Sequence, residues 1–225
     1  MINLAVAAAF LLALHTLPST PLRPWAVDRL GSKAYLGAFG LTSLGALVWL
    51  VMAFNAAPAA EPLWIVPGPW RFVGAIIMLI AFVMLVAGLS TPNPTALGSR
   101  PANPGKQSWR GINAVTRHPV LWAIGIWGLV HLLSKPDLAA ALFFGALALL
   151  AIGGAKLQEL RKARGLGEAW QAFASHTSFI PFAAILDGRA HLSLGEIGYW
   201  RIGAGIALWA VVLGAHGALF GVPAL

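Results

Sequence analysis

Long apolar segments are the feature that most constrains how this chain folds. Segments of about 16 to 24 mostly apolar residues recur along the whole sequence, and a helix of about 20 such residues crosses a bilayer core. The residues are 59% hydrophobic and only 10% charged, which is far more apolar than an ordinary soluble domain. Only helices and closed barrels satisfy the backbone in lipid, and the sequence lacks an alternating strand pattern. The chain is therefore predicted to be an all-α, polytopic integral membrane bundle.

Six transmembrane or re-entrant helices are expected. They cover roughly residues 2–17, 34–56, 71–90, 118–134, 137–155 and 200–222. The first follows Met1-Ile2-Asn3, which lacks the basic start of a secretory signal, so we expect it to be retained as a helix. The fourth and fifth are short, and Pro136 and Asp137 between them favour a tight turn into an antiparallel hairpin.

The 225 residues carry a net charge of +8 and no cysteine. The positive charges gather in alternate connections: Arg23, Arg29 and Lys33 in the first, Arg100, Lys106, Arg110 and Arg117 in the third, and Lys156, Arg161, Lys162, Arg164, Arg189 and Arg201 in or beside the fifth. By the positive-inside rule these connections face the cytoplasm and both termini face outward. The charge pattern therefore indicates a multi-pass membrane protein rather than a nucleic-acid binder. Because the chain has no cysteine, the sequence excludes disulfides, Fe–S clusters and covalently attached haem.

Two connections are long enough to be examined separately. Residues 91–117 are rich in Pro, Asn and Gly, which favours an irregular loop, either a lid or binding loop or a plain connector. Residues 156–175 have helical spacing, with apolar side chains on one face and basic side chains on the other. This pattern predicts a cytoplasmic interfacial amphipathic helix that breaks near Gly165 and Gly167.

Four histidines lie inside or at the ends of the predicted spans: His15, His118, His131 and His216. An ionisable group at membrane depth is costly and usually functional, and imidazole is a common ligand of metals and haem. The alternative for each ring is a hydrogen bond to a neighbouring helix. Arg117 and His118 directly precede Pro119 at a helix start, where they either bind an anionic group or anchor the helix end.

A family resemblance rests on four segments. They are TRHPVLWAIGIWGLVHLL, KLQELRKARGLGEAWQAFASHTSFIPF, the terminal HGALFGVP, and the pattern H-x-x-P-S-T-P-L-R that begins at His15. With these segments the chain, residues 1–225 as one domain, resembles the NnrU family of bacterial membrane proteins, which is named for an association with nitrite and nitric oxide reduction. That family is similar to the plant and cyanobacterial 15-cis-zeta-carotene isomerase, a haem b membrane enzyme.

The resemblance implies a non-covalent haem b whose iron is ligated by His15 and His131. It further implies either redox-type isomerisation of an apolar polyene or a redox role linked to denitrification, with membrane lipids and an apolar substrate or redox partner as contacts. The six-span topology places His15 level with His118, and His131 level with His216, so the implied pair meets only if spans are short or re-entrant. His118 and His216 are therefore alternative ligands or neighbours of the haem.

Two other functions stay open. The chain is also similar to isoprenylcysteine and phospholipid methyltransferases that bind S-adenosylmethionine. The matching positions are Arg117, His118, Glu159, Gly167, Trp170, Phe173, Ile180 and Pro181. It departs from them in having Leu and Trp after R-H-P and a tryptophan at Trp170, where tyrosine is common. A non-catalytic accessory or transport protein for a respiratory complex is the third possibility.

Overall fold

The computed structural model describes residues 1–95 and 109–225, which form helices joined by short irregular segments. Twelve helical segments are described within these ranges. They are α1 (Ile2–Thr16), the 3₁₀ turn η1 (Leu17–Ser19), α2 (Leu22–Leu30), α3 (Ser32–Asn55), α4 (Trp70–Ser90), α5 (Ile112–Val115), α6 (Pro119–Ser134), α7 (Leu138–Leu166), α8 (Glu168–His176), α9 (Ala183–Leu186), α10 (Leu194–Ile197) and α11 (Tyr199–Phe220).

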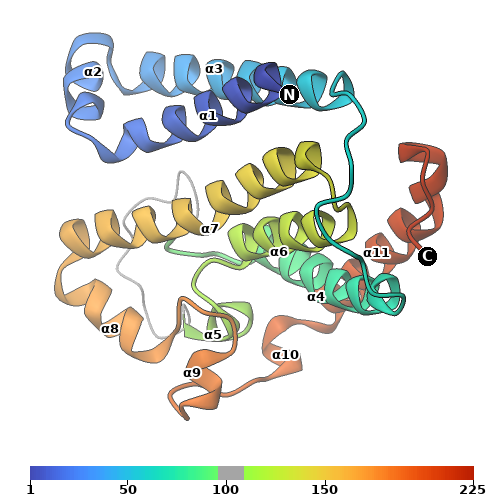
Figure 1. The fold of residues 1–225 in the computed structure, drawn as a ribbon. Helices are drawn as coiled ribbons and strands as arrows, with labels where there is room; N and C mark the ends of the chain where they lie inside the picture. The colour runs from blue at the N-terminus through green and yellow to red at the C-terminus, as the bar shows by residue number, and fades with distance from the viewer. Residues whose placement is uncertain (96–108) are drawn as a thin grey trace.

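The long helices pack in a row (Figure 1). Helices α1 and α3 pack against one another and against α7, α7 packs against α6, α6 against α4, and α4 against α11. Within the described ranges, five segments are long and apolar enough to cross a membrane: 2–19, α3, α4, α7 and α11. Helix α6 is apolar but has only 16 residues. The chain is a multi-pass helical membrane protein, as the sequence predicts.

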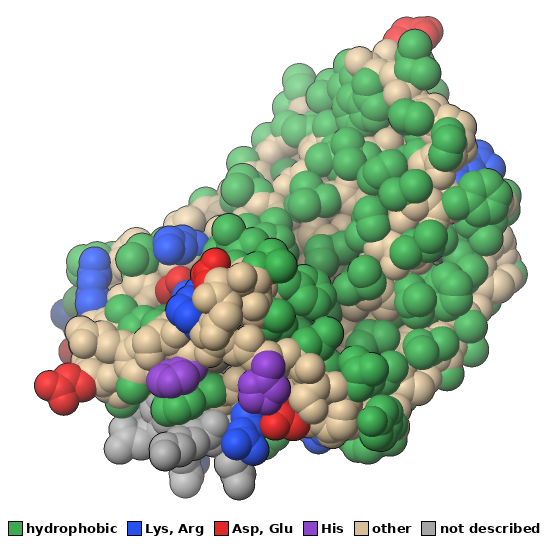
Figure 2. All heavy atoms as spheres, turned by 90° about the horizontal axis from the view of Figure 1, so that it is seen from below, with side chains coloured by type: hydrophobic (Ala, Val, Ile, Leu, Met, Phe, Trp, Pro, Cys, Tyr) green, Lys and Arg blue, Asp and Glu red, His purple; other side chains and the backbone are tan. Residues whose placement is uncertain are grey.

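The up-and-down order of the helices gives the bundle two ends. We call the end formed by residues 17–31, 109–118 and 167–198 the basic end, and the end formed by residues 56–69 and 135–137 the opposite end. Helices α1, α4 and α7 finish at the basic end, whereas α3, α6 and α11 finish at the opposite end (Figure 1). Seen from below, most of the charged and histidine side chains in view gather at one side of the molecule, and hydrophobic side chains are spread over the rest (Figure 2).

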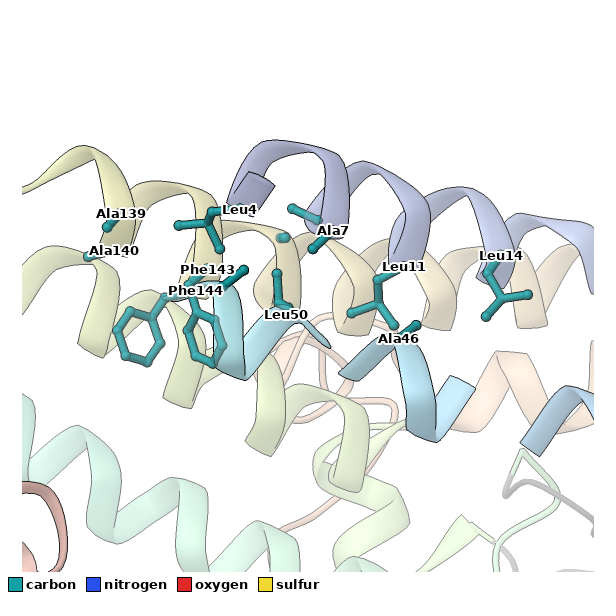
Figure 3. Close-up of a cluster of buried hydrophobic side chains, with 13 residues drawn as sticks. Leu4, Ala7, Leu11, Leu14, Ala46, Leu50, Ala139, Ala140, Phe143 and Phe144 are labelled. Carbon is teal, nitrogen blue, oxygen red and sulfur yellow. The ribbon is translucent and has the colours of Figure 1, made fainter. Parts of the chain in front are cut away.

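Small residues allow the central helices to approach closely. In α6, a Cβ atom added to Gly128 would lie 3.0 Å from the Phe144 carbonyl oxygen of α7. In α11, a Cβ atom added to Gly205 would lie 2.7 Å from the Val83 Cα of α4. Close backbone contact at small residues is the usual way in which membrane helices associate. Leucine, alanine and phenylalanine side chains of α1, α3 and α7 fill a separate core (Figure 3).

Most predicted helices are confirmed within a few residues, and two differences have a physical cause. The predicted fifth span ends at residue 155, but α7 continues to Leu166, so the basic amphipathic segment extends the same helix. The predicted break is confirmed at Gly167, whose φ of 52° lies in the left-handed region that glycine tolerates. In the predicted loop 91–117, residues 112–115 form the one-turn helix α5, and residues 96–108 lie outside those described.

Candidate functional site

A buried polar cluster lies at the basic end, centred on Arg117. Its Nε donates a 2.6 Å hydrogen bond to Glu159 Oε1 of α7, and its Nη1 donates to the carbonyl oxygens of Thr177 at 2.9 Å and Ala174 at 3.3 Å. The guanidinium also lies over the Trp170 ring, 5.7 Å from its centre. Arg117 is only 8% exposed. One side chain thus ties the start of α6 to α7, α8 and the segment that follows α8.

Glu159 lies close to three basic side chains. Besides Arg117, its carboxylate lies 3.4 Å from His118 Nε2 and 3.7 Å from Lys156 Nζ. His118 is 2% exposed, and its Nε2 contact with Glu159 falls outside hydrogen-bond geometry. Burial lowers the pKa of His118, and the nearby carboxylate of Glu159 offsets part of that shift. His118 is therefore neutral at physiological pH beside a charged Arg117–Glu159 pair.

The cluster includes polar residues that sequence reasoning missed. The Arg117 carbonyl oxygen accepts hydrogen bonds from Asn93 Nδ2 at 2.9 Å and Thr95 Oγ1 at 2.6 Å. The Arg117 backbone N–H donates to the Ser178 carbonyl oxygen at 2.9 Å. The available signal was the run Thr91-Pro92-Asn93-Pro94-Thr95, since Asn and Thr between prolines favour a turn built on side-chain hydrogen bonds.

The predicted methyltransferase residues do converge here. Arg117, His118 and Glu159 are in contact, and Trp170 lies under the guanidinium. This convergence has a structural explanation. The Glu159 carboxylate, which would face the sulfonium of S-adenosylmethionine in a methyltransferase, is paired with Arg117. A salt bridge buried with all its partners fixes the relative position of the elements that carry them.

A pair of histidines lies at the opposite end. The rings of His131 in α6 and His216 in α11 have centroids 6.3 Å apart and an interplanar angle of 22°. His131 Nδ1 bonds to the Trp127 carbonyl oxygen at 2.8 Å, and His216 Nδ1 bonds to the Val222 carbonyl oxygen at 2.7 Å. With a proton on each Nδ1, both Nε2 atoms carry a lone pair and can act as metal ligands.

An apolar groove lies between α4 and α6. Its lining consists of Met78, Ala81, Phe82 and Leu85 of α4 and Ala123, Ile124 and Trp127 of α6. The groove has a volume of about 100 Å³, which admits only part of a long apolar chain. Trp127 lines the groove and also contacts His131, since their ring centroids lie 5.0 Å apart.

The structure places His15 away from His131. Figure 3 shows Leu4 of α1 beside Phe143 and Phe144, and Leu14 at the far end of the cluster. Phe144 contacts the His131 ring at 5.1 Å between centroids. Since Leu4 and Leu14 are about 15 Å apart along a helix, His15 lies toward the basic end, where it contacts Phe39. The predicted heights of the histidines along the bundle are thus confirmed. His131 lies beside His216, and His15 lies at the end of the bundle that carries His118.

His131 and His216 supply two imidazole donors at the opposite end. Within residues 1–95 and 109–225, no three metal-binding side chains gather at one point, whereas structural and catalytic metal ions usually take three or four protein ligands. Haem iron needs only axial ligands from the protein, and one or two imidazoles supply them. Two cations, Arg71 at the start of α4 and Lys135 after α6, also lie at this end, and Lys135 Nζ is 3.5 Å from Asp137 Oδ2.

Comparison with known proteins gives a partial match to two plant enzymes. The chain is 38% identical over 81 residues to the chloroplastic 15-cis-zeta-carotene isomerase of Arabidopsis thaliana, and 37% identical over 82 residues to that of Zea mays. These segments are 35% and 36% of this chain but only 22% of each plant protein. No solved structure matches the chain significantly. The family described as NnrU protein matches residues 3–224, and the chain therefore belongs to the NnrU family.

Proposed function

We propose that this protein is a haem b-dependent isomerase of an apolar polyene in a bacterial inner membrane. The observation that carries the proposal is the apolar groove between α4 and α6, whose lining residue Trp127 has its ring centroid 5.0 Å from that of His131. The partial similarity to two enzymes named as 15-cis-zeta-carotene isomerases supports a polyene as the substrate class.

The residues of the groove have defined roles in this proposal. Side chains of α4 and α6, with Phe82 and Ile124 among them, bind a segment of the polyene by apolar contact, while the rest of the polyene lies in the bilayer. Trp127 positions that segment, and its carbonyl oxygen fixes the tautomer of His131. Haem b would supply a redox-active iron whose axial ligation the histidines of this chain set.

The test uses purified full-length protein expressed with ample haem supply. We expect a near-stoichiometric haem b spectrum, and conversion of 15-cis-zeta-carotene to its 15-trans isomer that depends on haem and on reduction with dithionite. Ala123→Trp, which fills the groove, is expected to abolish conversion but keep the haem spectrum. Phe72→Ala, an exposed position of α4 outside the groove, is the matched control and should keep both.

Other outcomes would replace the proposal. Haem-loaded protein that leaves every cis-polyene unchanged but exchanges electrons with nitrogen oxides or their reductases would indicate the denitrification-linked redox role. A colourless protein that binds S-adenosylmethionine, and loses this binding in Glu159→Ala, would indicate the methyltransferase alternative. A colourless protein without either binding activity would support an accessory role.

A further inference from the structure

We infer that His216, rather than His15, is the second axial ligand that pairs with His131. This inference rests on the proposed haem binding and names the ligand set of that site. With each ring centre about 1 Å behind its nitrogen and metal–nitrogen bonds of about 2.0 Å, two imidazoles on one metal have ring centres about 6 Å apart. The His131 and His216 centroids are 6.3 Å apart, so the separation of the two rings matches this arrangement.

The hydrogen bond at Nδ1 does not by itself identify a ligand. His15 Nδ1 bonds to the Leu11 carbonyl oxygen at 2.9 Å, and His176 Nδ1 bonds to the Ala172 carbonyl oxygen at 3.0 Å. The distinguishing feature of His131 and His216 is that two rings with this tautomer come from different helices and have centroids 6.3 Å apart. His15 instead contacts Phe39, and His176 stacks on Trp109 with ring centroids 3.9 Å apart.

Three contacts with α4 fix the helix that carries His216. Arg201 Nε donates to Ser90 Oγ at 3.1 Å, Gly205 lies against Val83, and Trp209 Nε1 donates to the Ala75 carbonyl oxygen at 3.0 Å. These contacts follow one side of α11 from its first turn to within two turns of His216. The ring is therefore positioned by packed contacts even though most of the surface of α11 is not covered by other parts of the protein.

The terminal sequence HGALFGVP explains how the His216 ring is oriented. Gly221 ends α11 in the left-handed conformation with a φ of 75°, which turns the chain back toward the helix. The turn brings the Val222 carbonyl oxygen to 2.7 Å from His216 Nδ1. A carbonyl on the nitrogen opposite the metal is the usual partner of a ligating histidine, so this segment acts as a positioning element for the ligand.

The experiment compares single variants of full-length protein by absorption and electron paramagnetic resonance spectroscopy. Wild type is expected to give a low-spin bis-imidazole spectrum. His216→Ala is expected to convert the spectrum to high-spin or to lose haem, and free imidazole should restore the low-spin form. His216→Met is expected to keep six-coordinate haem with a shifted histidine–methionine signature. His15→Ala, together with the exposed control His176→Ala, should keep the wild-type spectrum.

Three other results would contradict the ligand assignment, and one of them would also contradict the proposed function. If His216→Ala and His216→Met keep the wild-type spectrum while His15→Ala loses it, the inference is wrong and haem binding stands. If wild type contains no haem after expression with ample supply, the proposed function fails, and the ligand assignment fails with it. A third result also overturns the assignment. In it, His216→Ala loses the low-spin spectrum and imidazole does not restore it, while the spectrum of His216→Met is unshifted.

Discussion

Single residues set the stability of the basic end. Glu159 is 7% exposed and neutralises a buried guanidinium, and removing one partner of such a pair leaves an uncompensated charge. We expect Glu159→Gln to lower the free energy of unfolding by about 3 to 5 kcal/mol, measured by thermal unfolding in detergent. Lys156→Gln is the matched control on the same carboxylate. Its side chain is 61% exposed, so its removal should cost less than about 1 kcal/mol. Equal losses in the two variants would contradict this account.

His118 should make stability depend on pH. Its folded-state pKa lies below the ordinary value of 6.5 because the ring is buried, so below that value the unfolded chain binds a proton that the folded protein excludes. Stability is therefore fully present above pH 6.5 and falls as the pH decreases further. The measurement is the melting temperature of wild type and His118→Asn between about pH 7.5 and about pH 5. The wild-type curve should fall more steeply, and parallel curves would disprove the assignment.

At this scale the sequence predicts the principal residues but not their partners. The R-H-P motif identifies Arg117 and His118 because charged groups before a helix start are conspicuous in an apolar chain. Asn93 and Thr177 escape notice because each bonds to backbone or to Arg117 across more than twenty residues. Such contacts depend on the packing of α4, α6 and α8, which no local pattern encodes.

At the scale of the helices, close contact between α6 and α7 depends on missing side chains. A Cβ atom on Gly128 would lie 3.0 Å from both the Ala148 Cβ and the Phe144 carbonyl oxygen, so a larger residue must separate the helices. We expect Gly128→Leu to cost about 1 to 3 kcal/mol and to lower the yield of folded protein in size-exclusion chromatography. Gly145→Leu, in α7, is the control, since nothing lies within 4 Å of its Cβ position. Similar stability of the two variants would argue against close packing here.

The sequence predicts where helices occur better than where they end. Hydrophobicity predicts a fifth span that stops at 155, whereas the helix continues through basic residues to Leu166. Charged side chains make a helix segment favour water over lipid but leave its backbone hydrogen bonds intact. Helix α7 therefore continues through the basic residues and ends at Gly167. The short α5 is missed because four residues carry too little periodicity to distinguish a turn of helix from a loop.

For the whole molecule, topology is the most informative prediction. Alternation of spans places His131 level with His216 and His15 level with His118, and the structure agrees on both levels. The resemblance instead implies ligation by His15 and His131, and that pairing stays a prediction. The sequence does not predict which helices become neighbours. The observed row of α7, α6, α4 and α11 does not follow from chain order alone.

The short α6 has a consequence for the lipid around the bundle. Sixteen residues rise about 24 Å, several ångströms less than a typical hydrocarbon core. Where α6 meets lipid, the bilayer must therefore thin locally, which costs fractions of a kcal/mol for each ångström of hydrophobic mismatch. We expect a higher melting temperature in short-chain than in long-chain phosphatidylcholine vesicles, and the reverse order would show that α6 is shielded from lipid. If the melting temperature is higher in the short-chain vesicles, membrane thickness acts on His131 and on the side of the groove that α6 forms.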